Sequence, residues 1–213
     1  MREQNMVRVP RGVGLLLTLG GVVGLIASLV LTVDKIHLLQ DPSYVPGCFI
    51  NAEFSCGSVM TSWQASLFGF PNSLVGLVGF AVVTALGVVV ATGTALPRWI
   101  WWGLQFGVLA AVVFIHWLMV QSIFDIEALC LYCMAVWAVT IPMFTYVTAV
   151  TVLSDPARHH GPDDGSDEEG VDDEGVDTAP GSATVAVHLS PRLVLIPLIW
   201  LAGVAALIVI RFG

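Results

Sequence analysis

The chain has 213 residues, of which 56% are hydrophobic and only 11% are charged, and its mean hydropathy is +0.86. A soluble domain of this length would carry about 25% charged residues, so the composition excludes an ordinary soluble globular protein. The net charge is −8, but ten of the sixteen acidic residues lie between residues 155 and 177. The rest of the chain is close to neutral, and no basic patch indicates a nucleic-acid partner.

Long uncharged runs set the expected architecture. They cover residues 13–33, 64–97, 99–124, 128–154 and 193–210. A helix needs about 20 apolar residues to cross a bilayer, so we expect five spanning helices and an all-α integral membrane protein. The first run is longer than the apolar core of a signal peptide, which has about 7–15 residues, and no A-x-A cleavage site follows it. We therefore expect it to be retained as the first helix.

The Lys/Arg bias of the short loops predicts the orientation. An N-terminus inside the cell puts six basic residues on the inner side and two on the outer side, which are Lys35 and Arg211. We expect a multi-pass protein of the plasma membrane with a cytoplasmic N-terminus, an extracytoplasmic C-terminus and an outer loop at residues 35–72. The acidic segment 154–190 has the composition of a disordered cytoplasmic linker, and residues 191–213 form the fifth span.

Four cysteines all fall on the predicted outer side, where disulfides form and persist. Cys48 and Cys56 lie in the loop, and Cys130 and Cys133 lie at the start of the fourth predicted helix. A helix N-terminus stabilises a thiolate. Residues i and i+3 have Cβ atoms about 5–6 Å apart, whereas a disulfide prefers about 3.8 Å. A bridge there would be easily reduced, as catalytic disulfides are, and the loop pair would suit a shuttle to a soluble partner.

Two other interpretations of the cysteines remain open on spacing alone. Two structural disulfides could staple the outer loop of a non-enzymatic membrane scaffold. A four-cysteine zinc site is less favoured, because zinc pairs usually have two to four intervening residues and the loop pair has seven, so we expect no metal. Trapping with an alkylating agent separates these possibilities, since a scaffold stays fully oxidised whereas an oxidase shows mixed redox states.

The cysteines belong to a longer pattern. It runs from Cys48 and Cys56 through Ser62-Trp63 and the run Asn72-Ser73-Leu74-Val75-Gly76 to Cys130-Leu131-Tyr132-Cys133. In order and spacing it resembles the vitamin K epoxide reductase family, over about residues 12–153. The resemblance implies a four-helix bundle around a quinone pocket in residues 1–153, with the fifth helix outside the bundle.

The resemblance also implies a role for each cysteine. Cys133 is expected beside the quinone, and Cys130 is expected to exchange with Cys56 through an interdomain disulfide. Cys48 and Cys56 are expected to meet an extracytoplasmic protein of thioredoxin fold. We expect no fused thioredoxin-like domain after the fifth helix, and therefore a separate partner protein. The implied activity is a quinone-dependent thiol–disulfide oxidoreductase that reoxidises this partner, with menaquinone or ubiquinone as acceptor.

Three further residues carry expectations from the family pattern. Asn72 is expected to donate a hydrogen bond to a quinone carbonyl, and Ser62 is expected near a short membrane-interface helix that caps the pocket. Trp137, where well-known animal members carry tyrosine, is expected to contact the quinone; its indole can donate a hydrogen bond but cannot accept one. Outside the pattern, we expect His116 to be a neutral histidine bonded to a neighbouring helix. The alternative enzyme is the unrelated bacterial quinone-linked disulfide oxidase with four helices, which has a similar function. It keeps its CxxC motif in the first outer loop, whereas this chain has the motif at the start of the fourth predicted helix.

Overall fold

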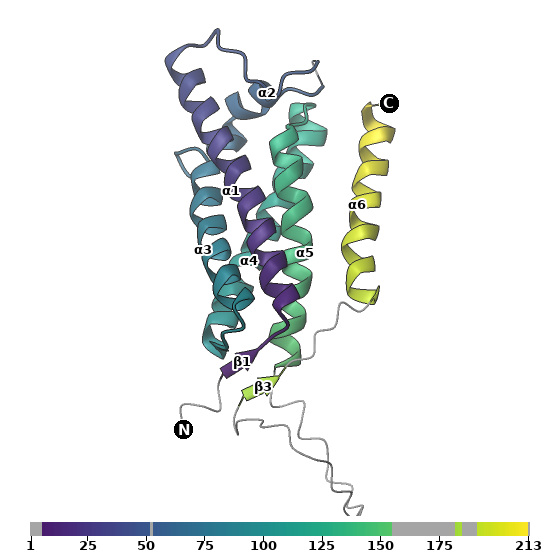
Figure 1. Ribbon diagram of the computed structural model, residues 1–213. Helices are drawn as coiled ribbons and strands as arrows, with labels where there is room; N and C mark the ends of the chain where they lie inside the picture. Colours follow the sequence, from purple (N-terminus) through teal and green to yellow (C-terminus); the bar gives the residue numbers. More distant parts are fainter. Residues whose placement is uncertain (1–5, 52, 155–181, 185–190, 213) are drawn as a thin grey trace, which may run out of the picture.

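The computed structural model describes residues 6–51, 53–154, 182–184 and 191–212, and it is dominated by long helices (Figure 1). Five of the described helices are long and apolar enough to cross a membrane, which confirms the predicted all-α membrane fold. They are α1 (Arg11–Gln40), α3 (Ser73–Ala91), α4 (Arg98–Gln121, continued by η3), α5 (Leu131–Leu153) and α6 (Pro191–Phe212).

The first two long helices, α1 and α3, pack closely because glycines remove the side chains between them. A Cβ atom built on Gly21 would lie 2.4 Å from Oγ1 of Thr84, and one built on Gly87 would lie 2.6 Å from the backbone nitrogen of Thr18. Small residues of this kind let helix backbones approach each other in a membrane. The glycines therefore fix α1 and α3 as one unit, against which α5 packs.

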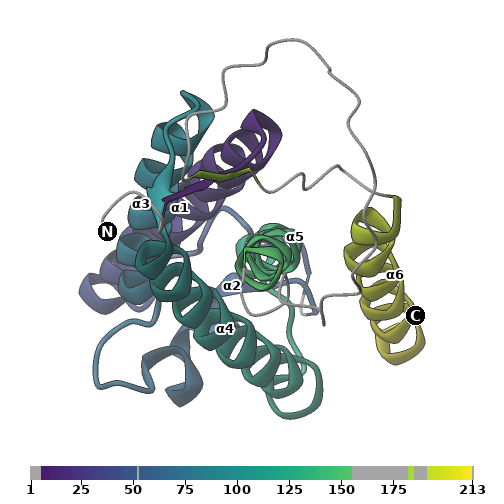
Figure 2. The same cartoon turned by 90° about the horizontal axis from the view of Figure 1, so that it is seen from below.

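Helix α5 lies at the centre of the assembly when it is viewed along the helix axes (Figure 2). The larger buried cluster joins α1, α3, α4 and α5, and its fully covered side chains include Leu17, Trp101 and Val147. A second cluster lies between α4 and α5 and reaches α6 through Trp200. Four helices thus form the bundle, and α6 stands at its side.

Two polar contacts attach α6 to the bundle, one through Trp200 and the other through Arg211. Nε1 of Trp200 donates to Nε2 of His116 at 2.8 Å, and Nδ1 of His116 lies 2.7 Å from the carbonyl oxygen of Val112. The hydrogen bond to Trp200 confirms the expectation that His116 is bonded to a neighbouring helix. Near the other end of α6, Arg211 forms an ion pair with Glu127.

The segment between α1 and α3 covers one end of the bundle, which we call the loop end. It contains the short helix α2 (Cys56–Thr61) and the 3-10 turn η2 (Trp63–Ser66). A turn of π-helix, η3 (Ser122–Ile126), ends α4 at the same level. Helix α1 continues to Gln40, well past the uncharged run that predicted it, because the polar groups of Asp34 and Lys35 find hydrogen-bond partners in this loop.

A small three-stranded sheet closes the opposite end, the sheet end. Strand β1 (Met6–Arg8) pairs antiparallel with β2 (Leu96–Pro97) and parallel with β3 (Ser182–Thr184). Strands of two or three residues are too short to show an alternating pattern, so the sequence did not predict them. Strand β3 lies inside the predicted linker 154–190, and residues 155–181 and 185–190 of that linker lie outside the described residues.

Candidate active site

The loop is held against the start of α5 by backbone hydrogen bonds. The backbone N–H of Ser55 donates to the carbonyl oxygen of Leu129 at 3.0 Å, and the N–H of Leu129 donates to the carbonyl oxygen of Glu53 at 2.7 Å. Phe54 and Leu129 thus form a parallel β-bridge. Cys130 directly follows Leu129, and Cys56 comes two residues after Phe54, so the pairing places Cys56 beside Cys130.

Three of the four cysteine sulfurs lie together in the structure, and the fourth cysteine packs against them. Cys48 and Cys56 are joined in a disulfide with their Cα atoms 5.9 Å apart, while Cys130 and Cys133 are free thiols. Sγ of Cys130 lies 3.0 Å from Sγ of Cys56. The predicted loop and helix pairs therefore meet, although residues 56 and 130 are 74 positions apart in the chain.

Helix starts position the two facing cysteines. Cys56 is the first residue of α2, whose N-cap Ser55 accepts a hydrogen bond from the backbone N–H of Ser58. Cys130 is the N-cap of α5. The hydrogen bond from the Cys133 thiol, assisted by the backbone N–H groups of Cys133 and Tyr132, lowers the pKa of the Cys130 thiol, against the opposing effects of burial and the charge of Asp34. Cys130 is therefore the thiol of the pair that ionises more readily.

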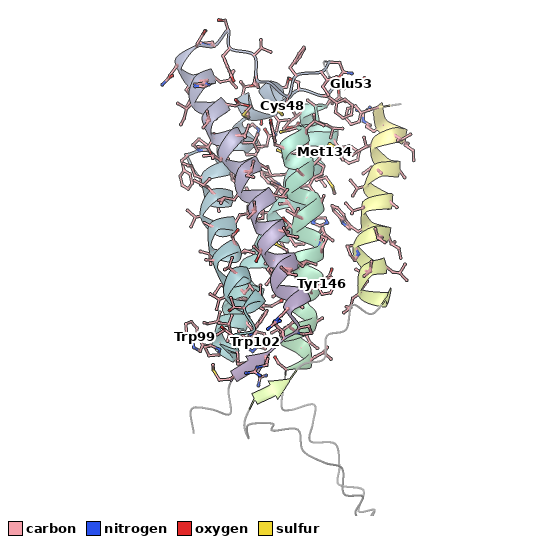
Figure 3. The ribbon with its side chains drawn as sticks, in the orientation of Figure 1. Cys48, Glu53, Trp99, Trp102, Met134 and Tyr146 are labelled. Carbon is pink, nitrogen blue, oxygen red and sulfur yellow. A yellow bond between two sulfur atoms is a disulfide. The ribbon has the colours of Figure 1, made fainter. Side chains whose placement is uncertain are left out.

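The disulfide differs in accessibility at its two ends. Cys56 and Cys130 are completely covered, whereas Cys48 keeps 5% of its surface exposed. A groove of about 310 Å³ lies beside this part of the loop. Residues next to both disulfide cysteines line it, including Pro46, Phe49, Ser55 and Gly57. Figure 3 shows Cys48 at the loop end of the bundle. An external thiol would therefore reach Cys48 more easily than Cys56.

Cys133 connects the cysteine cluster to the interior of the bundle. It packs against the cluster of Cys48, Cys56, Met60 and Cys130 on one side, and against the α4–α5 cluster on the other. Trp137 belongs to the second cluster, one turn deeper on the same face of α5, and is almost completely covered. Met134, labelled in Figure 3, also packs against it. The four-cysteine arrangement thus runs from the loop surface to an apolar interior.

A family model for the vitamin K epoxide reductase family matches residues 15–148, which is well over half of the chain. The chain belongs to the vitamin K epoxide reductase family. The match covers all four cysteines and nearly the whole bundle, and it confirms the resemblance that the sequence pattern indicated. Membership indicates a membrane thiol–disulfide oxidoreductase, and members of the family are generally linked to a quinone.

Within this family framework, Asn72 organises the loop. Its side-chain Nδ2 donates to the carbonyl oxygen of Gln64 at 2.6 Å, and its Oδ1 accepts from the backbone N–H of Leu67 at 3.2 Å. An amide group has two N–H donors, so one remains for a ligand. Ser62 lies between α2 and η2, as expected near a short capping helix, and its hydroxyl donates to the carbonyl oxygen of Val59 at 2.7 Å.

Two side chains at the loop end were missed by the sequence reasoning. Gln64 is 1% exposed, and its Nε2 donates to Oδ2 of Asp125 at 2.5 Å, which ties the loop to η3. Asp34 is buried near the end of α1 and accepts a hydrogen bond from the Tyr44 hydroxyl at 2.9 Å. Gln64 is the first residue of an uncharged run, and nothing in the sequence around it indicated that its side chain would be buried. Asp34 could have been noticed as an ionisable residue at the end of a span.

Proposed function

We propose that this protein transfers electrons from the thiols of a separate, extracytoplasmic thioredoxin-fold protein to menaquinone or ubiquinone in the membrane, and thereby supports disulfide bond formation. The observation that carries the proposal is the 3.0 Å distance between Sγ of Cys56 and Sγ of Cys130. Disulfide exchange proceeds when a thiolate attacks one sulfur of a disulfide. The structure holds a free thiol in that position beside the loop disulfide.

The redox state fits a defined stage of such a relay. The loop pair is a disulfide and the helix pair is a dithiol, as they would be after electrons have passed from the loop to the helix and before they leave Cys133. Disulfide exchange is reversible, and the sulfurs of Cys56 and Cys130 react with each other in either direction. A Cys56–Cys130 bridge is therefore the intermediate that we expect in turnover.

The partner side of the relay is assigned to Cys48. Its partial exposure and the neighbouring groove allow a thiol of the partner to attack Cys48, which leaves Cys56 as the thiol that goes on to Cys130. Orientation follows from the Lys/Arg bias, which puts this end of the bundle outside the plasma membrane. A reporter fused after Gly213 should then be active only outside the cytoplasm.

The quinone side is assigned to Cys133, because it is the cysteine that packs against the apolar α4–α5 cluster. Trp137 and Ile141, deeper on α5, belong to the same apolar cluster as Cys133, which suits a flat apolar ring. The family pattern assigns the hydrogen-bond donor to Asn72, whose amide has a second N–H besides the one bonded to Gln64. A bound quinone would supply a two-electron, two-proton acceptor. The residues of the chain supply an apolar environment, a hydrogen-bond donor and the dithiol.

The alternative of a non-enzymatic scaffold with two structural disulfides makes a different prediction. A scaffold would keep bridges 48–56 and 130–133, and it has no reason to bring Cys56 and Cys130 together. The free thiols of Cys130 and Cys133 favour the relay.

The relay is tested by trapping its intermediate. Replacing both Cys48 and Cys133 with alanine removes the thiols that would resolve the mixed disulfide, so the Cys56–Cys130 bridge should accumulate as a stable species. Peptide mapping after alkylation without reduction measures it. The matched control replaces Cys56 and Cys133, which leaves Cys48 and Cys130; it should give little bridge, because Cys56 and not Cys48 faces Cys130. Recovery of Cys56 and Cys130 mainly as free thiols in the first variant would show that the relay is wrong.

A further inference from the structure

Exchange between the two cysteine pairs needs a route for protons as well as for electrons. Cys56 and Cys130 have no exposed surface, so bulk water does not reach the sulfurs that exchange. Each thiol must nevertheless lose its proton before it attacks and regain one after it leaves, since the thiolate is the nucleophile. A group that accepts and returns a proton inside the cluster would meet this need.

Asp34 is the only charged side chain that is buried in the part of the chain that the structure describes, with 7% of its surface exposed. Burying a carboxylate is costly unless it is paired, and the partner found for it is a neutral one, the Tyr44 hydroxyl at 2.9 Å. Its neighbour in sequence, Lys35, donates instead to the carbonyl oxygen of Met60 at 2.5 Å. The site therefore keeps an uncompensated carboxylate near the end of α1.

The position of Asp34 on its helix directs it toward the cysteines. Leu31 and Leu38 both pack in the cluster that contains Cys48, Cys56 and Cys130. Asp34 is three residues after Leu31 and four before Leu38, so the three side chains share one face of α1. The negative charge of Asp34 also acts on the Cys130 thiol and opposes its ionisation. Geometry thus places the carboxylate on the face of α1 that packs against the cysteine cluster, within range of an electrostatic effect on Cys130.

We infer that Asp34 is a proton-transfer residue for the exchange between Cys56 and Cys130, with Tyr44 holding its carboxylate in place. The inference rests on the proposed relay. As Cys56 bonds to Cys130, its thiol proton passes to Asp34, the Cys130–Cys133 bond breaks, and the electron pair stays on Cys133. Cys48 then gives its proton to the Cys133 thiolate and bonds to Cys56, and Cys130 leaves as a thiolate and takes the proton back from Asp34. The loop pair is oxidised, the helix pair is reduced, and the two thiol protons of the loop pair are balanced by those gained by the helix pair.

Other titratable groups surround this carboxylate, and none of them replaces it. On α1, Lys35 is bonded to Met60, and the His37 ring lies edge-on to Tyr44 with the ring centroids 5.1 Å apart. From the loop, the hydrogen bond to Asp34 raises the pKa of Tyr44, which keeps its hydroxyl a donor. From α5, Tyr132 packs on the cysteine cluster.

The test measures internal exchange alone, without quinone or partner. The full-length protein in detergent, with both pairs oxidised, is mixed with dithiothreitol, quenched with acid at intervals and alkylated. Peptide mapping then follows free Cys130 and Cys133 after the loop pair has been reduced. Asp34→Asn keeps the acceptor for Tyr44 but removes the base, so we expect exchange at least about tenfold slower at about pH 6.5, since general bases typically contribute 10²–10⁴-fold. The difference should shrink near pH 9, because thiols with a reference pKa of about 8.5 then ionise unaided.

Two variants keep the result interpretable. Asp34→Glu retains a carboxylate and should restore most of the rate. Asp41→Asn removes a charge of the same sign from an exposed loop carboxylate that is bonded to Ser43, and should leave the rate unchanged. A purely structural role for Asp34 would slow exchange equally at every pH, and a purely repulsive charge would make Asp34→Asn faster; either outcome overturns the inference. Failure of the unsubstituted protein to exchange between its pairs would instead contradict the relay itself.

Discussion

Helices α5 and α6 are similar in length, and each contains an internal proline, yet they are packed very differently. Half of the most apolar stretch of α5 is buried within the protein, against 11% of that of α6. The more buried helix is the less apolar of the two. It also contains buried threonines, among them Thr140, Thr145 and Thr151, each bonded to the carbonyl four residues earlier.

This difference shows that insertion of a helix into the bilayer and its packing against other helices depend on different features. Apolar side chains drive a helix into the bilayer but give it no reason to leave lipid for another helix, because lipid tails are just as apolar. Close packing instead depends on small residues and on hydrogen bonds such as the one between Gln105 of α4 and Thr148 of α5 at 3.0 Å. Helix α5, which contains Cys133, is held on several sides, and α6 is attached at a few points.

The largest expected difference between the two helices is in activity. Cys133→Ala in α5 should lower quinone reduction by at least about 10³-fold, since loss of the residue that performs a covalent step is typically this severe. The protein should still fold, because Cys133 is a free thiol and only half-buried. Turnover with a reduced thioredoxin-fold substrate measures the loss. Leu198→Ala in α6, where the side chain is 53% exposed, is the control and should keep turnover within about threefold. Retained turnover in Cys133→Ala would remove α5 from the electron path.

A matched pair of glycine substitutions tests packing. A Cβ atom on Gly87 of α3 would lie 2.6 Å from the backbone of Thr18, whereas nothing lies within 4 Å of one on Gly203 of α6. Gly87→Ala should therefore lower the free energy of unfolding in detergent by about 1–3 kcal/mol, the usual cost of overpacking. Gly203→Ala should be neutral or stabilising by up to about 1 kcal/mol, because alanine is the better helix former. Equal effects at the two sites would mean that α6 is as tightly packed as the bundle.

The smallest effect is expected at the contact that holds α6. Trp200→Phe keeps an aromatic ring but removes the donor to His116, and interhelical hydrogen bonds in membranes average about 0.6 kcal/mol. A double-mutant cycle with His116→Ala, read by thermal unfolding in detergent, isolates that coupling. Trp99→Phe, at a site that is 73% exposed, provides the control with no change. A coupling several times larger would make α6 an integral part of the bundle.

Much of this fold could be predicted because the bilayer requires each spanning helix to contain about 20 apolar residues. Uncharged runs located all five helices, and the motif order identified the family. The helix ends were less predictable. Charge marks where an apolar run stops, but α1 continues through Asp34 and Lys35 because both find partners in a loop that folds back over them. The outer loop also includes the start of the uncharged run 64–97, where η2 forms before α3 begins at Ser73.

The candidate site could be predicted as a set of cysteines but not as a geometry. The spacing identified two pairs, and only the fold shows that Cys56 rather than Cys48 meets Cys130; on sequence, that choice depended on the family pattern. Asp34 could have been noticed as an ionisable residue at the end of a span, but Gln64 could not be assigned, because its importance comes from burial and from a partner distant in the chain. A polar residue in a loop has the same sequence signal whether it is solvated or completely covered.

The bridge between Phe54 and Leu129 has a consequence for how such a protein can change over generations. Its hydrogen bonds join backbone groups of Glu53, Ser55 and Leu129, and backbone groups are the same in every residue except proline. Side chains along the bridge can therefore be exchanged without moving Cys56 away from Cys130. The side chains that line the groove nearby, such as Val45 and Phe49, take no part in this backbone pairing. The groove can therefore change while the distance between the two sulfurs is kept.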